Sequence, residues 1–145
     1  MEQSYAEKSA WVLLVTLLVA FGWYFYSHGG ALVAGSLTFG DMLGALIGLV
    51  VLIVVVEVTF HVMLGIEAAH DSRLTELTET DERDDLIDVK SERFASFVLA
   101  TGAVGGIFSA AFLTAVMTAH VLLLALVLAE SAKLISKLAY YRRGV

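Results

Sequence analysis

Four long apolar stretches constrain this chain more than any other feature. They cover about residues 10–26, 41–69, 94–116 and 120–141 of the 145. A bilayer core needs about 20 apolar residues per helix, so each stretch is a candidate membrane span, the first at the short end. The stretches are continuously apolar rather than alternating, which indicates helices and not a β-barrel. The sequence therefore predicts one all-α membrane domain, a bundle of four transmembrane helices.

The composition supports a membrane protein and excludes several kinds of site. Hydrophobic residues make up 59% of the chain, more than a soluble domain of this size carries. Cysteine is absent, which excludes disulfides, thiolate metal sites and cysteine nucleophiles. The first residues, "MEQSYAEK", are acidic rather than basic, so the first apolar stretch is interpreted as a span and not as a signal peptide.

The basic residues predict how the four spans are oriented. With these spans, all Lys and Arg fall on one side of the membrane or at that side's edge. They are Lys8, Arg73, Arg83, Lys90, Arg93, Lys133, Lys137, Arg142 and Arg143. The positive-inside rule then places both termini and the 71–93 loop in the cytoplasm. Arg142 and Arg143 follow two tyrosines, a pattern typical of an anchor to anionic lipid headgroups.

The segments between the spans differ in character. Residues 27–40, "SHGGALVAGSLTFG", are rich in glycine and almost uncharged, which favours a short external loop. Residues 71–93 carry nine Asp or Glu against four Lys or Arg. Within them "TETD" at 78–81 fits a capping box, with Thr78 as the N-cap of a helix that continues into the third span. Acidic residues at the start of that helix suit its dipole.

Three segments resemble a family of small prokaryotic four-helix membrane proteins known as a domain of unknown function. The segments are "EVTFHVML" at 57–64, "DERDDLIDVKSER" at 81–93 and "LAESAKLISKLAYYRRG" at 128–144. The Glu82-Arg83-Asp84 triplet is the most distinctive part. The resemblance implies residence in a prokaryotic plasma (inner) membrane and a cytoplasmic acidic motif at that triplet, with little indication of chemistry.

Small residues repeat every four positions in three of the spans. Gly40, Gly44 and Gly48 do so in the second, Gly102 and Gly106 in the third, and Ala125 and Ala129 in the fourth. This spacing lets helix backbones approach closely, and in lipid helix association depends on such packing. The alternative is that glycine is simply frequent in membrane helices. These faces can pack within one chain or between chains, and both possibilities stay open. For packing between chains, a homo-oligomer or a partner membrane protein is expected.

Glu57 and His61 are unusual in a stretch this apolar. They lie four residues apart and so share one helix face. A charge near the bilayer centre costs about 2.5–3.5 kcal/mol on insertion scales, so such residues usually face protein or water. Glu130 in the fourth span lies at a similar depth, which predicts a cluster of Glu57, His61 and Glu130 able to hold a proton, a divalent metal or a cationic ligand. Alternatively, Glu57 bonds only His61, and Glu130 pairs with Lys133.

Two other pairs are weaker candidates for metal ligands. Glu67 and His70 have the Glu-x-x-His spacing of di-iron bundles, but it occurs once, so a solvated helix end is favoured. His28 and His120 both fall at the external edge and are interpreted as interfacial residues that together would bind a metal weakly. A haem held by His61 would need a second histidine at matching depth, which is not apparent. The sequence specifies no metal and no cofactor.

Three classes of function stay open. The first is a small transporter or channel that moves or binds a proton or cation at the Glu/His cluster. The second is a non-enzymatic accessory subunit that presents its acidic cytoplasmic helix to a basic partner. The third is a membrane enzyme, for which the sequence has no glycine-rich phosphate loop, HExxH motif or Ser-His-Asp signature. The expected partners are the lipid bilayer and membrane proteins, and no nucleic acid.

Overall fold

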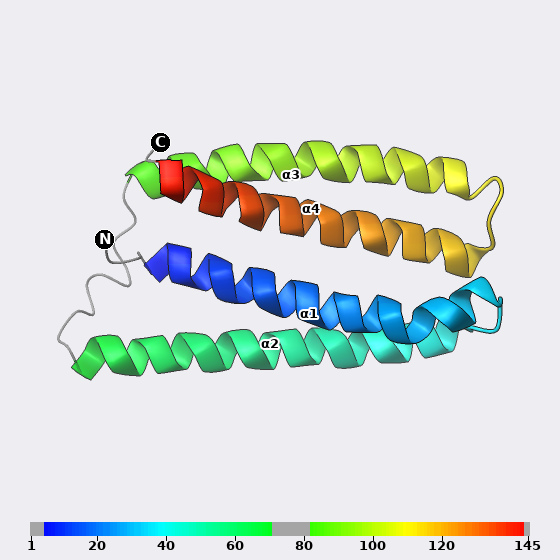
Figure 1. The fold of residues 1–145 in the computed structure, drawn as a ribbon, viewed down its shortest axis with the longest axis horizontal. Helices are drawn as coiled ribbons and strands as arrows, with labels where there is room; N and C mark the ends of the chain where they lie inside the picture. The colour runs from blue at the N-terminus through cyan, green and yellow to red at the C-terminus, as the bar shows by residue number, and fades with distance from the viewer. Residues whose placement is uncertain (1–4, 71–81, 144–145) are drawn as a thin grey trace.

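Long helices lie lengthwise beside one another in this protein, as the computed structural model shows for residues 5–70 and 82–143 (Figure 1). The side chains of residues 67–70 lie outside the described part. The helices are α1 (Tyr5–Val33), α2 (Phe39–His70), α3 (Glu82–Ser109) and α4 (Ala115–Arg143). The prediction of an all-α fold with four helices is confirmed over these residues. The capping box expected at 78–81 lies outside them.

Three of the helices are long and apolar enough to cross a membrane: α1, residues Phe39–Ile66 of α2, and α4. The helix α3 differs because its first half is charged and it ends at Ser109 rather than at 116. Its apolar part, residues 94–109, is about 24 Å long at 1.5 Å per residue. This part alone is shorter than the roughly 30 Å hydrocarbon core of a bilayer.

The turn between α1 and α2 is much shorter than the loop expected at 27–40. The helix α1 continues to Val33, and Gly35 then adopts a left-handed φ of 69°. The Gly35 N–H donates to Leu32 O at 3.1 Å and the Ser36 N–H donates to Ala31 O at 3.0 Å, which is a Schellman motif. Glycine at 29 and 30 is tolerated inside a helix at a cost of about 1 kcal/mol each, so the helix ends only at Gly35, where the backbone reverses.

Thr38 and Asp41 begin α2 with a reciprocal cap. The Asp41 N–H donates to Thr38 Oγ1 at 3.2 Å, and the Thr38 N–H donates to the Asp41 carboxylate at 3.2 Å. This is the capping box of the type Thr-x-x-Asp, and it satisfies backbone donors that a helix start would leave unpaired.

The turn between α3 and α4 lies at 110–114, earlier than the connection expected at 117–120. Thr114 is the reason, because its Oγ1 accepts the Met117 N–H at 3.3 Å and so caps the start of α4. Residues 117–120 therefore lie within α4 and do not form a loop.

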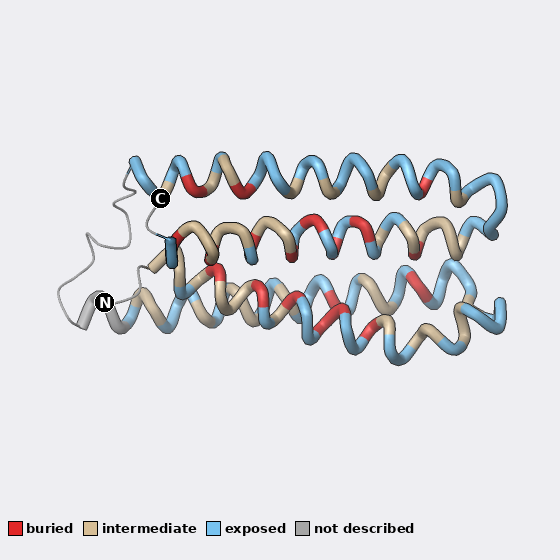
Figure 2. The backbone as a smooth tube through the Cα atoms, turned by 45° about the horizontal axis from the view of Figure 1, so that its top comes forward, coloured by how far each residue is buried: buried red, intermediate tan, exposed pale blue. Residues whose placement is uncertain are grey.

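The helices pack in the order α2, α1, α4, α3 (Figure 1). Buried residues follow α1 and α4, whereas α2 and α3 are largely exposed (Figure 2). The start of α1 and the end of α4 lie at one end of the bundle, here called the termini end. The two short turns, 34–38 and 110–114, lie at the other, the loop end. In the middle of the order, α1 packs on α4 and so joins the two helical hairpins.

Polar pairs connect α3 to α4 near the termini end. On each helix the pairing residues recur every four positions, so they form one row on the contacting faces. The pairs are Asp84 with the Tyr141 hydroxyl at 2.9 Å, Asp88 with Lys137, and Glu92 with Lys133 at 3.0 Å. The acidic start of α3 is therefore held against the basic end of α4 within the same chain.

Candidate functional site

Glu57 and His61 lie on one face of α2, as their spacing predicts. The His61 Nδ1 is 2.7 Å from the Glu57 backbone oxygen, and 3.9 Å from the Glu57 Oε2. A carbonyl oxygen can only accept, so Nδ1 carries the proton and Nε2 of the neutral ring keeps its lone pair. Tyr5 of α1 approaches the imidazole edge-on, with ring centroids 5.8 Å apart.

The two side chains differ in burial. The Glu57 side chain is 19% exposed and that of His61 is 43% exposed. The Glu57 Oε1 is buried and has no hydrogen-bond partner among the described residues. His61 lies one turn nearer the termini end than Glu57, so the more exposed group is also the one closer to that end. A proton reaching this pair from the termini end meets His61 before Glu57.

Glu130 is exposed on α4, which is separated from α2 by α1 in the packing order. It interacts electrostatically with Lys133, as the alternative interpretation expected. Among the described residues, no group of three or more His, Asp or Glu is arranged to hold a metal ion. The structure thus supports Glu57 and His61 as a pair, and does not assemble a three-residue metal site with Glu130.

The glycine positions divide into two groups. A Cβ added at Gly102 would overlap Ala125 of α4, and one at Gly106 would overlap the Leu122 side chain. By contrast, a Cβ at Gly44 or Gly48 would meet nothing within 4 Å, and one at Gly40 only Thr38. Gly102 and Gly106 therefore lie at a close α3–α4 contact. Within the described residues, the stripe in α2 makes no close contact with another helix.

The charged motifs lie at the termini end. In the acidic motif, Glu82 is exposed, Asp84 bonds Tyr141, and the Arg83 guanidinium donates to Tyr141 O at 3.3 Å. Arg142 and Arg143 are exposed, and the Arg142 guanidinium lies 5.5 Å from the centre of the Trp11 ring. This cation–π contact links the end of α4 to the start of α1. The Glu67–His70 pair lies outside the side chains that the structure describes.

A second polar cluster joins α1 to α4 near the loop end, and sequence reasoning missed it. The Tyr24 hydroxyl is 2.9 Å from His120 Nε2, and these residues are 2% and 4% exposed. The His120 Nδ1 donates to Val116 O at 2.8 Å, so the neutral ring accepts the Tyr24 proton at Nε2. Tyr24 also stacks on His28, with centroids 4.8 Å apart. No local pattern connects residues 96 positions apart, so the sequence carries no signal for this contact.

Comparisons with known proteins give no information about this site. No family model matches the chain, and no curated protein or solved structure matches it. The resemblance to a family of small four-helix membrane proteins therefore stays a prediction.

Proposed function

We propose that this protein is an integral membrane protein of a prokaryotic plasma membrane that binds or transfers a proton or cation at Glu57 and His61. The observation that carries the proposal is the buried Glu57 Oε1, which has no hydrogen-bond partner among the described residues. A bare carboxylate in an apolar helix is costly, and either a proton or a bound cation removes that cost.

The geometry supports an order of proton steps. His61 is the more exposed group and its Nε2 is free to accept a proton from the termini end. The resulting imidazolium lies beside the Glu57 carboxylate, where opposite charges stabilise each other. Transfer of one proton from the imidazolium to the carboxylate leaves a neutral histidine and a neutral acid. The pair then needs no other ion to stay uncharged in the membrane.

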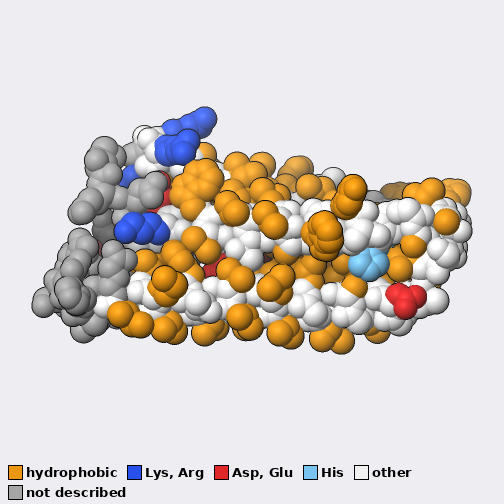
Figure 3. Space-filling view, turned by 60° about the horizontal axis from the view of Figure 1, so that its bottom comes forward, with side chains coloured by type: hydrophobic (Ala, Val, Ile, Leu, Met, Phe, Trp, Pro, Cys, Tyr) orange, Lys and Arg blue, Asp and Glu red, His pale blue; other side chains and the backbone are white. Residues whose placement is uncertain are grey.

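The proposal of a membrane protein is supported by the three long apolar helices. The proposal that α3 is a fourth span is supported by its packing, because α3 lies along α4 and its apolar residues 94–109 would share the bilayer with that helix. Lys and Arg gather toward the termini end on the face that Figure 3 shows. The proposed orientation therefore has both termini in the cytoplasm.

Cysteine labelling tests this orientation. The chain has no native cysteine, so Ser36→Cys at the loop end and Glu82→Cys at the termini end each provide a single thiol. We expect a membrane-impermeant maleimide added to intact cells to label position 36 and to label position 82 only after the membrane is opened. Labelling of both positions in intact cells, or of 82 alone, would contradict the four-span model with cytoplasmic termini.

Substitution of Glu57 tests the proton site. In proteoliposomes containing a pH-sensitive dye, we expect Glu57→Gln to reduce proton uptake to the level of protein-free liposomes, because the amide keeps the shape but takes up no proton. Glu57→Asp, which keeps a carboxyl, should retain part of the uptake. Glu130→Gln is the matched control and should behave as the unmodified protein, since Glu130 is exposed on another helix. Equal loss in the Glu57 and Glu130 variants would restore the three-residue cluster and reject the pair.

A further inference from the structure

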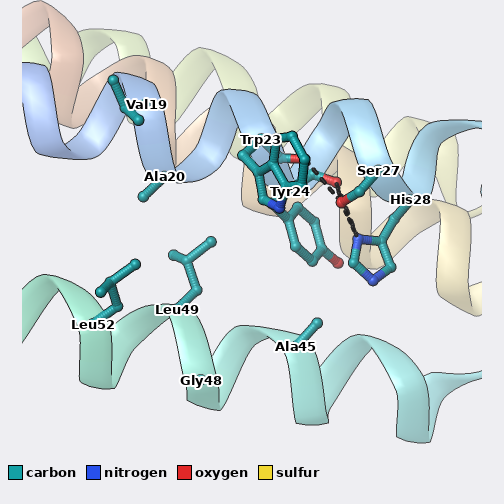
Figure 4. A pocket seen from close by; sticks show the side chains of 10 residues that line it. All are labelled: Val19, Ala20, Trp23, Tyr24, Ser27, His28, Ala45, Gly48, Leu49 and Leu52. Carbon is teal, nitrogen blue, oxygen red and sulfur yellow. Dashed lines mark hydrogen bonds between the residues drawn. The ribbon is translucent and has the colours of Figure 1, made fainter.

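A groove of about 370 Å³ runs between α1 and α2 toward the loop end (Figure 4). Toward the termini end it is lined by apolar side chains, among them Val19, Ala20, Leu49 and Leu52. Toward the loop end it is lined by Trp23, Tyr24, Ser27 and His28, so the polar groups lie at one end only. This gradient along the bundle matches a molecule that is apolar along its length and polar at one tip.

Hydrogen bonds around His28 determine which of its two ring nitrogens carries the proton. The Nδ1 lies 3.1 Å from the Tyr24 backbone oxygen and 2.9 Å from Ser27 Oγ. The serine hydroxyl donates its own proton to the Trp23 backbone oxygen at 2.8 Å, so Oγ accepts from His28. Both neighbours of Nδ1 are therefore acceptors, and Nδ1 carries the ring proton. In the neutral imidazole Nε2 is then an acceptor, and among the described residues no donor bonds it.

The charge around this end of the groove favours a cation. Asp41 lies close enough to His28 for electrostatic interaction, and its carboxylate is exposed. No Lys or Arg occurs between residues 9 and 72, which include all of α2 and nearly all of α1. The Trp23 ring, which lines the groove and is 69% exposed, adds an aromatic face of the kind that attracts ammonium groups.

We propose that the α1–α2 groove binds an amphiphilic cation: a single aliphatic chain that ends in a primary ammonium group. The chain lies along the apolar part of the groove. The ammonium donates a hydrogen bond to His28 Nε2, near the Asp41 carboxylate and the Trp23 ring. An anionic or zwitterionic lipid fits less well, because its phosphate would face Asp41 with no Lys or Arg from either groove helix near it.

Tryptophan fluorescence tests the proposal directly. The chain has two tryptophans, so Trp11→Phe leaves Trp23, which lines the groove, as the only one. The probe is a dodecylammonium ion brominated in mid-chain, added to the protein in phosphatidylcholine nanodiscs. We expect saturable quenching of Trp23. In the Trp23→Phe protein, where Trp11 is the reporter, we expect only the linear quenching caused by partition into lipid.

Four substitutions separate binding in the groove from partition. Gly48→Leu should weaken the saturable phase by about tenfold, because Gly48 lines the groove and a leucine there occupies the chain's space. Gly44→Leu is the matched control and should have no effect, since Gly44 is equally open but does not line the groove. His28→Ala and Asp41→Asn should each weaken binding by about tenfold, the scale of one charge-assisted hydrogen bond.

Changes in the probe complete the test. A brominated dodecyltrimethylammonium ion has no N–H donor and should bind about tenfold more weakly than dodecylammonium. A brominated dodecyl sulfate should show only linear quenching. Linear quenching by dodecylammonium, equal effects of Gly48→Leu and Gly44→Leu, or saturable binding of the sulfate at the same affinity would each overturn the proposal. None of these outcomes depends on proton transfer at Glu57.

Discussion

Gly102→Leu should lower the stability of the bundle by about 3 kcal/mol, the upper part of the range for overpacking. Even the first side-chain carbon at this position would overlap the Ala125 Cβ, and it would lie 3.3 Å from the Ala125 Cα. Backbone yields less readily than the end of a side chain, so the leucine can fit only if α3 and α4 move apart. That movement would also stretch the polar row in which Asp88 contacts Lys137. The measurement is the midpoint of unfolding in a detergent titration, followed by circular dichroism.

Gly105→Leu provides the matched control for this prediction. It makes the same change in the same helix, but a Cβ at Gly105 meets nothing within 4 Å. We expect no loss of stability there, and a gain of up to about 1 kcal/mol because leucine favours a helix more than glycine does. Adding Ala125→Gly to Gly102→Leu should recover part of the loss. If both glycine variants were destabilised equally, the α3–α4 contact at Gly102 would be wrong.

The charged halves of α3 and α4 carry complementary rows that are visible in the sequence. Asp84, Asp88 and Glu92 recur every four residues, as do Lys133, Lys137 and Tyr141. Antiparallel neighbours with complementary rows at this spacing place the pairs opposite one another. The sequence also leaves open that the acidic helix is a surface for a basic partner. The three acids of this row contact α4 of their own chain, and binding of a basic partner through this helix stays a prediction.

Helix boundaries were predictable where polar side chains form the caps. The Thr38-x-x-Asp41 box is visible in the sequence and sets the start of α2. Thr114 likewise sets the start of α4, although the apolar residues on either side of it give no indication of a turn in the sequence. Apolar composition alone gave the existence of the helices and not their ends, because a membrane helix and its flanking turn have similar hydropathy.

Neighbouring helices were not predictable from the sequence. The helix α2 is apolar on all sides, so its pattern does not indicate which face packs against protein. The rise per residue along a helix predicts a similar depth in the membrane for Glu57 and Glu130. Depth does not determine how each helix is rotated about its axis, nor which helices are neighbours. The position of α1 between α2 and α4 separates the two helices that carry them. The shared face of Glu57 and His61 was predictable because both residues belong to one helix, where spacing alone determines which residues share a face.

Tyr24→Ala should destabilise the bundle by about 3–5 kcal/mol, the cost of removing a large buried aromatic side chain. Tyr24 is one of the largest fully buried side chains among the described residues, and it packs where α1 meets α4. Those two helices join the two hairpins, so a void at this position weakens the contact on which the four-helix arrangement depends. Tyr26→Ala is the control on the same helix, and it should change stability by less than about 0.5 kcal/mol because Tyr26 is 82% exposed.

Tyr24→Phe separates the hydrogen bond from the packing. The ring is kept, but His120 Nε2 loses the hydroxyl that lies 2.9 Å away and stays buried without a donor. An unsatisfied buried acceptor costs about 1–3 kcal/mol, so Phe should fall between Tyr and Ala. Changing both partners, with Tyr24→Phe and His120→Leu together, should cost less than the sum of the two single changes, because no polar atom is then left unpaired. Strict additivity in this double-mutant cycle would mean that Tyr24 and His120 do not interact, and that α1 and α4 are held together by apolar packing alone.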